Sequence, residues 1–155
     1  MKRVIVFFLC LPLLATGPLT PINEAGFQKL VESHKGKVVL YDFWATWCGS
    51  CRAELPELVL LERRLGARGL EVVTISADDR KHQAVAEKFM RMFDVQGPAY
   101  LKQAADEDRF IDAIDPKWGG ALPALFLYDR AGRKVRSFIG ETDMATLERA
   151  IQKLL

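Results

Sequence analysis

The feature that most constrains the fold is the passage from an apolar run into a helical pattern around two cysteines. Residues 37–44 are continuous and rich in Val, Tyr, Phe and Trp, and a run that is apolar on both faces is typical of a central strand. Cys48 and Cys51 follow this run, separated by a glycine and a serine, and leucines at helical spacing then continue to Leu65. The two cysteines are therefore expected where a buried strand gives way to a helix.

The rest of the chain alternates helical and strand patterns. Apolar runs predict further strands over residues 70–76, 99–102, 124–128 and 134–139. Helical spacing predicts helices over residues 23–33, 78–93, 106–114 and 142–154. Strands separated by helices pair in parallel, whereas the closing hairpin must be antiparallel. The predicted fold class is α/β, with a mixed central β-sheet flanked by helices on both faces.

Polar residues at the predicted helix starts are expected to cap them. Asp78 and Asp79 precede one helix and Thr142 precedes the last. The helix that ends near Phe93 is expected to turn three apolar residues inward: Val85, Phe89 and Met92. Both histidines are expected to be exposed, His34 in a turn and His82 in a first helical turn.

The first residues have the composition of a secretory signal. Lys2 and Arg3 precede an apolar stretch over residues 4–14, and small residues follow at 15–17. About eleven apolar residues are too few to span a bilayer comfortably. We expect residues 1–17 to be a signal peptide or leader, cleaved near residues 15–20 or retained as an N-terminal anchor. Residues 18–155 are then one exported domain, periplasmic or otherwise extracytoplasmic.

Charge and cysteine usage narrow the functional classes. The formal net charge is +2, and Lys2 and Arg3 in the leader account for it. A near-neutral domain gives no electrostatic reason to expect binding to nucleic acid or to a membrane surface. Of three cysteines, Cys10 lies in the leader, which leaves one pair in an oxidising compartment.

Two cysteines three residues apart at a helix start are suited to thiol–disulfide exchange. Free backbone N–H groups and the helix dipole stabilise a thiolate at Cys48, so its pKa should fall below the ordinary value of about 8.5. Cys51, one turn later, can attack a mixed disulfide on Cys48 and release the partner. A zinc site needs four ligands and a copper site needs a well-placed histidine, and only His34 and His82 are available. A structural disulfide enclosing two residues constrains the unfolded chain little, so we expect redox chemistry and no metal.

The segment around the cysteines resembles the active-site signature of the thioredoxin superfamily. Residues 44–51 read Trp-Ala-Thr-Trp-Cys-Gly-Ser-Cys, and residues 52–56 read Arg-Ala-Glu-Leu-Pro. The second stretch is similar to the TlpA/ResA-like group of exported thiol–disulfide oxidoreductases. The resemblance covers residues 19–155 and includes a short strand–helix insertion at 99–114. It implies a thioredoxin fold.

The resemblance also implies roles for individual residues. Cys48 matches the nucleophile and Cys51 the resolving cysteine, the two forming a redox disulfide. Pro123 matches a cis-proline that faces the cysteines, and with Trp47 and Leu122 it is expected to contact substrate.

Two acidic residues match the family's proton carriers. Asp42 lies within the apolar strand and matches a buried acid that takes the proton of the resolving thiol; a structural acid is the alternative. Glu54 matches a glutamate of cytochrome-maturation relatives, and a solvated helix charge is its alternative.

The sequence thus predicts an enzyme that reduces or exchanges disulfides in partner proteins. By family analogy its clients include apocytochrome c or metallochaperones, and an upstream thiol protein supplies electrons. No nucleotide-binding fingerprint or other cofactor motif is visible. Two alternatives remain, a thiol peroxidase of the same fold and a thioredoxin-fold binding or chaperone module. Peroxidases usually place Thr three residues before the reactive cysteine, whereas Thr46 lies two before Cys48.

Overall fold

The computed structural model describes residues 18–155, so the predicted leader lies outside the described residues. Its centre is a six-stranded sheet in the order β1-β4-β3-β2-β5-β6. The first four strands in that order are parallel to one another, and β5 runs antiparallel to both of its neighbours, β2 and β6. The strands are β1 (Thr20–Ile22), β2 (Val38–Trp44), β3 (Leu70–Ser76), β4 (Ala99–Lys102), β5 (Ala124–Tyr128) and β6 (Lys134–Ile139). The predicted mixed α/β sheet is confirmed.

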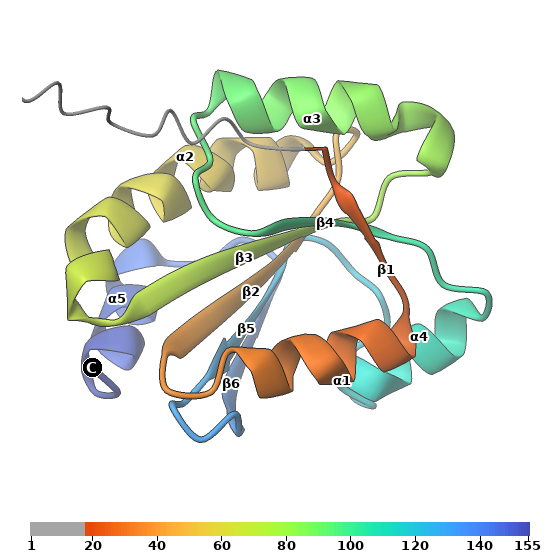
Figure 1. Ribbon diagram of the computed structural model, residues 1–155. Coiled ribbons are helices and arrows are strands. Elements are labelled where there is room, and N and C mark those ends of the chain that lie inside the picture. The colour runs from red at the N-terminus through yellow and green to blue at the C-terminus, as the bar shows by residue number, and fades with distance from the viewer. Residues whose placement is uncertain (1–17) are drawn as a thin grey trace, which may run out of the picture.

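Helices cover both faces of the sheet (Figure 1). One face packs against α1 (Glu24–Ser33) and α4 (Glu107–Ile114). The other packs against α2 (Gly49–Leu65), α3 (Gln83–Met92) and α5 (Met144–Gln152). The predicted strand–helix insertion is present as β4 and α4. No helix within residues 18–155 has the length and apolar character needed to cross a bilayer.

Strand β2 lies at the centre of the core. All seven of its residues are buried, and the side chains alternate between the two helical layers. Val39, Tyr41 and Phe43 pack toward α1 and α4, in a cluster of aromatic rings. Val38 and Leu40 pack toward α2 and α5. The one carboxyl group in this strand, Asp42, therefore points to the α2 face.

The N-terminal strand was missed by the sequence prediction. The sequence predicted no strand before residue 37, whereas β1 pairs in parallel with β4 at the edge of the sheet. Three residues contain no recognisable period, so this pairing depends on the tertiary fold alone.

Two predicted helix caps are wrong. Asp143, not Thr142, caps α5 by accepting the Thr146 N–H at 3.0 Å. Asp78 is buried and bonds to a different loop, and a short 3-10 turn at Arg80–His82 precedes α3. As a result α3 begins later than predicted.

The later start of α3 also changes its inner face. Ala86 and Met90 are the buried residues, whereas Val85 and Met92 are exposed. The exposed position predicted for His34 is wrong. Its side chain is 13% exposed, and Nδ1 lies 3.0 Å from the Leu30 carbonyl oxygen. The exposed position predicted for His82 is confirmed.

The close approach of Gly97 to β3 gives a test of this packing. A Cβ at Gly97 would lie 2.2 Å from the Val72 carbonyl oxygen, whereas a Cβ at the helical Gly66 meets nothing within 4 Å. We expect Gly97→Ala to lower the free energy of unfolding by about 1–3 kcal/mol or more, because backbone must move. Gly66→Ala should leave it unchanged or raise it slightly. Urea unfolding of both variants provides the measurement, and equal stabilities would contradict this packing.

Candidate active site

Cys48 and Cys51 lie where β2 ends and α2 begins, as predicted. Cys48 is the N-cap of α2, and its sulfur accepts the Cys51 N–H at 3.2 Å. The two sulfurs are joined as a disulfide. A cap position is where backbone N–H groups lack helical partners, so the sulfur of Cys48 lies at the positive end of the helix.

Both cysteines are buried, Cys48 slightly less than Cys51. Cys48 is 7% exposed and Cys51 is 2% exposed. The Ser50 hydroxyl lies 3.6 Å from the Cys48 sulfur, and Trp47, beside Cys48, is 69% exposed. A partner approaching from solvent therefore meets Trp47 and Cys48 before Cys51.

The loop before β5 forms the opposite wall of this site. Ala124 pairs with Phe43, so the preceding Leu122 and Pro123 come to the same end of the sheet as the cysteines. The Leu122–Pro123 peptide bond is cis, as predicted. Leu122 packs against the apolar cluster that contains both cysteines.

Asp42 and Glu54 lie behind the cysteines, on the α2 face of the sheet. Asp42 is 2% exposed, and one of its oxygens has no hydrogen-bond partner. Burial, and secondarily the negative charge of Glu54, raises the pKa of Asp42 well above its ordinary value. The Asp42 carboxyl group therefore keeps its proton to a higher pH than an exposed aspartate does.

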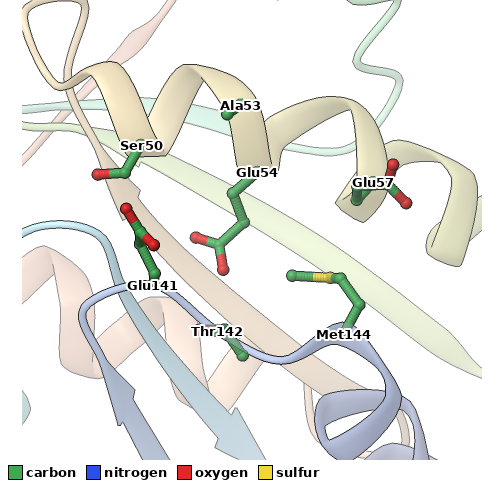
Figure 2. Close-up of a pocket in the computed structure, with 7 residues that line it drawn as sticks. All are labelled: Ser50, Ala53, Glu54, Glu57, Glu141, Thr142 and Met144. Atoms are coloured by element: carbon green, nitrogen blue, oxygen red, sulfur yellow. The ribbon is translucent and has the colours of Figure 1, made fainter.

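Glu54 is buried as well. The alternative that it is a solvated charge on the helix surface is therefore excluded. It is 9% exposed, and neither carboxyl oxygen makes a hydrogen bond of normal geometry. Burial raises its pKa; the nearby Thr142 hydroxyl and backbone N–H partly oppose this effect, and Glu141 adds to it. Figure 2 shows Glu54 pointing from α2 toward the turn that carries Glu141 and Thr142.

Asp78 is a residue of this region that the sequence prediction assigned to another role. Its carboxylate accepts the Thr46 N–H at 3.0 Å, the Thr46 hydroxyl at 2.6 Å and the Ser76 hydroxyl at 2.7 Å. It thereby ties the end of β3 to the loop that leads into Cys48. The spacing of a Ser and an Asp two residues apart after a strand was the available signal, but the partner Thr46 is remote in sequence.

Within the described part of the chain, no three His, Cys, Asp or Glu side chains come together in a way that could hold a metal ion. The predicted site residues gather at one end of the sheet, with Cys48, Cys51 and Trp47 at the start of α2. Leu122 and Pro123 lie opposite them, and Asp42 and Glu54 lie behind. This arrangement brings a disulfide, an apolar approach surface and two protonatable groups together.

The buried Asp42 predicts a pH dependence of stability. Because its pKa is raised in the folded protein, Asp42 keeps a proton that the unfolded chain releases near pH 4. Folding therefore takes up a proton, and the free energy of unfolding falls as pH rises from about 4 through the folded pKa. Asp42→Asn, which imitates the protonated form, should be more stable than the parent at pH 8 and should lose less stability between pH 5 and 8. Equal pH slopes in urea unfolding would contradict this assignment.

Asp78 predicts a large loss of stability on substitution. Asp78→Ala leaves buried donors on Thr46 and Ser76 without an acceptor and should cost about 3 kcal/mol or more. Asp79→Ala is the matched control, because Asp79 is exposed and should change stability by about 0.5 kcal/mol or less. Chemical denaturation compares the two, and a similar small loss in both would show that the Asp78 bonds contribute little.

Comparison with known proteins finds a matching family model and relatives that are named thiol-disulfide oxidoreductases. The family model described as "AhpC/TSA family" matches residues 19–137. A thiol-disulfide oxidoreductase ResA from Bacillus cereus is 31% identical over 120 residues. The match covers 77% of this chain and 65% of the relative, so the chain spans just under two thirds of that protein's length.

Solved structures agree on the fold. A putative thiol:disulfide interchange protein DsbE from Chlorobium tepidum matches with a TM-score of 0.58 at 26% identity, covering 80% of this chain and 81% of that one. A thiol-disulfide isomerase from Corynebacterium glutamicum matches with a TM-score of 0.69 at 20% identity, covering 80% and 84%. The predicted resemblance to the thioredoxin superfamily and its ResA-like members is confirmed. The chain therefore belongs to the AhpC/TSA family of the thioredoxin superfamily.

Proposed function

We propose that this protein is an extracytoplasmic thiol–disulfide oxidoreductase that reduces or exchanges disulfides in partner proteins. The observation that carries the proposal is the Cys48–Cys51 disulfide at the N-terminus of α2, opposite Leu122 and Pro123. The structure then represents the oxidised state of the cycle.

In the reductive direction, the reduced Cys48 begins the reaction. Its thiolate attacks one sulfur of the client disulfide, the client S–S bond breaks, and the second client sulfur leaves as a thiolate. The Cys51 N–H beside the Cys48 sulfur and the helix dipole favour the thiolate that this step needs. Trp47 and Leu122 supply an apolar surface for the client segment next to its cysteine.

Cys51 completes the reaction. Its thiol loses a proton and attacks the Cys48 sulfur, which breaks the mixed disulfide and releases the second client thiolate. Two electrons have passed to the client, and Cys48 and Cys51 are joined again. Asp42 and Glu54, buried on the same side of the sheet, are the groups we assign to carry the proton. An upstream thiol protein would reduce the pair for the next cycle, and no other cofactor is needed.

The relatives support this activity by their names, since the ResA protein of Bacillus cereus is a thiol-disulfide oxidoreductase. The export proposal has a separate basis. It rests on the basic, apolar and small residues of positions 1–17, in the order of a secretory leader.

A thiol peroxidase of the same fold is the main alternative enzyme. The hydroxyl of Thr46 is engaged by Asp78 at 2.6 Å, so it does not point to the Cys48 sulfur as a peroxide-binding group would have to. Cys51 is joined to Cys48 in a disulfide. Both features favour dithiol exchange with proteins over peroxide reduction.

Insulin reduction tests the proposed activity. The reduced protein with dithiothreitol should accelerate insulin precipitation, and Cys48→Ser should return the rate to that of dithiothreitol alone. Peroxide consumption measured in parallel should stay at background. Undiminished insulin reduction by Cys48→Ser would remove the basis of the proposal, and rapid Cys48-dependent peroxide consumption would favour the peroxidase.

The order of the two cysteines has its own test. Cys51→Ser should accumulate a covalent complex with client proteins, because the mixed disulfide on Cys48 cannot be resolved. Non-reducing electrophoresis of a periplasmic or secreted extract, followed by mass spectrometry, detects the complex and names the client. Complexes that form with Cys48→Ser instead would reverse the assignment.

A further inference from the structure

The outer face of α3 carries basic and exposed apolar side chains together. Met92 is 60% exposed and Val85 is 43% exposed. Lys88 and Arg91 are exposed on the same side, since residues three and seven apart share one face of a helix. An arginine and a lysine of the 3-10 turn that precedes the helix extend this surface. We call these six residues the α3 face: Arg80, Lys81, Val85, Lys88, Arg91 and Met92.

Most of the cations on the α3 face have no acidic partner. Within residues 18–155, no ion pair involves Arg80, Lys88 or Arg91. Lys81 is the exception, with its Nζ 3.4 Å from the Asp79 carboxylate. The near-neutral net charge of the domain therefore conceals a basic patch on one side of it.

The described chain begins beside the α3 face. The Leu19 N–H donates to the Glu87 carboxylate at 3.2 Å, and the Gln83 side-chain amide donates to the Leu19 carbonyl oxygen at 3.4 Å. Leu19 is buried in the cluster between α3 and the sheet, and Figure 1 shows β1 starting next to α3. Residues 1–17, which include the apolar stretch of the predicted leader, therefore join the domain at α3.

An anionic membrane surface fits both properties of the α3 face. A basic helix with apolar side chains between its charges binds in the plane of the bilayer interface. Each Lys or Arg near an anionic lipid surface strengthens binding about fivefold. The acyl chains provide apolar contact for Val85 and Met92.

The α3 face needs a second attachment to stay on a membrane. Two exposed apolar side chains are few, and an apolar attachment of limited size gives marginal, reversible binding unless a basic patch supports it. A retained leader would provide that attachment, because it joins the domain beside α3. Linking two weak attachments raises the effective concentration of the second, so the pair binds much more tightly than either alone.

We propose that the α3 face binds the surface of a bilayer that contains anionic phospholipid, while the retained leader attaches the chain to the same membrane. The inference goes beyond the proposed function and does not depend on the thiol chemistry. Ala86 and Met90 are the buried residues of α3, so the α3 face is directed away from the sheet. Trp47 and Cys48 lie at the end of the sheet, where a client can still reach them.

Quenching of a fluorescent label by lipid tests the inference in the full chain. Cell-free synthesis keeps residues 1–17 in place, and Cys10→Ser leaves no other free thiol, because the active-site cysteines form a disulfide. Met92→Cys then receives a bimane label. The matched control carries the label at Val135→Cys, which is 45% exposed on β6, at the opposite edge of the sheet from β1. Vesicles contain phosphatidylcholine alone or mixed equally with phosphatidylglycerol, each with a headgroup nitroxide lipid as the quencher.

The expected result is a contrast between the two label sites. Quenching at residue 92 should be at least about three times that at residue 135 in the mixed vesicles at low salt, because the cations keep this face on the anionic surface. High salt should reduce the contrast by screening, and neutral vesicles should remove it.

Charge variants identify the α3 face as the source of the contrast. Lys81→Gln, Lys88→Gln and Arg91→Gln combined in the labelled chain should remove it. The control removes three exposed cations from the side of the sheet that packs against α1 and α4, and should keep it: Lys29→Gln, Arg109→Gln and Lys117→Gln. Urea unfolding establishes that both triple variants fold.

Two results would overturn the inference. One is equal quenching at residues 92 and 135 in the mixed vesicles, including none at either, which would leave the α3 face to an acidic protein. The other is a contrast that persists in neutral vesicles or in the variant without the α3 cations. The readout uses no thiol exchange, so failure of insulin reduction would refute the proposed function without affecting this inference.

Discussion

The structure depends on the complete burial of β2. Seven consecutive residues lie between two helical layers, and the ladders to β3 and β5 hold them on both sides. This fixes the point where the chain leaves the sheet, and α2 begins at Gly49, five residues after Trp44, with Cys48 as its cap. The same pairing brings Pro123 to that point from β5. The reactive sulfur is therefore positioned by the core, in which Cys48 is largely buried.

The site also depends on two buried carboxyl groups. Asp42 and Glu54 are carboxyl groups placed in apolar surroundings without full hydrogen bonding, which lowers stability. The same burial raises the pKa of both carboxyl groups above the ordinary values. Two such groups beside a disulfide lower the stability of the fold, and buried groups that lower stability are typical of functional sites.

Much of the fold and the core of the site could be predicted from the sequence, and the failures share a cause. The long strands, α2 and the cysteine junction have strong local patterns, and each was predicted within a few residues. Strand β1 has no pattern of its own because it forms only against β4. Asp78 and Thr142 were read as helix caps since both are polar residues before a helix. Their actual contacts, with Thr46 and beside Glu54, join segments distant in sequence.

If Cys48 is the attacking thiolate, its thiol should be more acidic than a free cysteine. The pH dependence of iodoacetamide alkylation of the reduced protein measures this acidity, with the modified residue located by mass spectrometry. We expect Cys48 to be alkylated first, with an apparent pKa below the ordinary value of about 8.5, and Cys51 to be protected. Preferential alkylation of Cys51, or a Cys48 pKa at or above that of a free thiol, would contradict it.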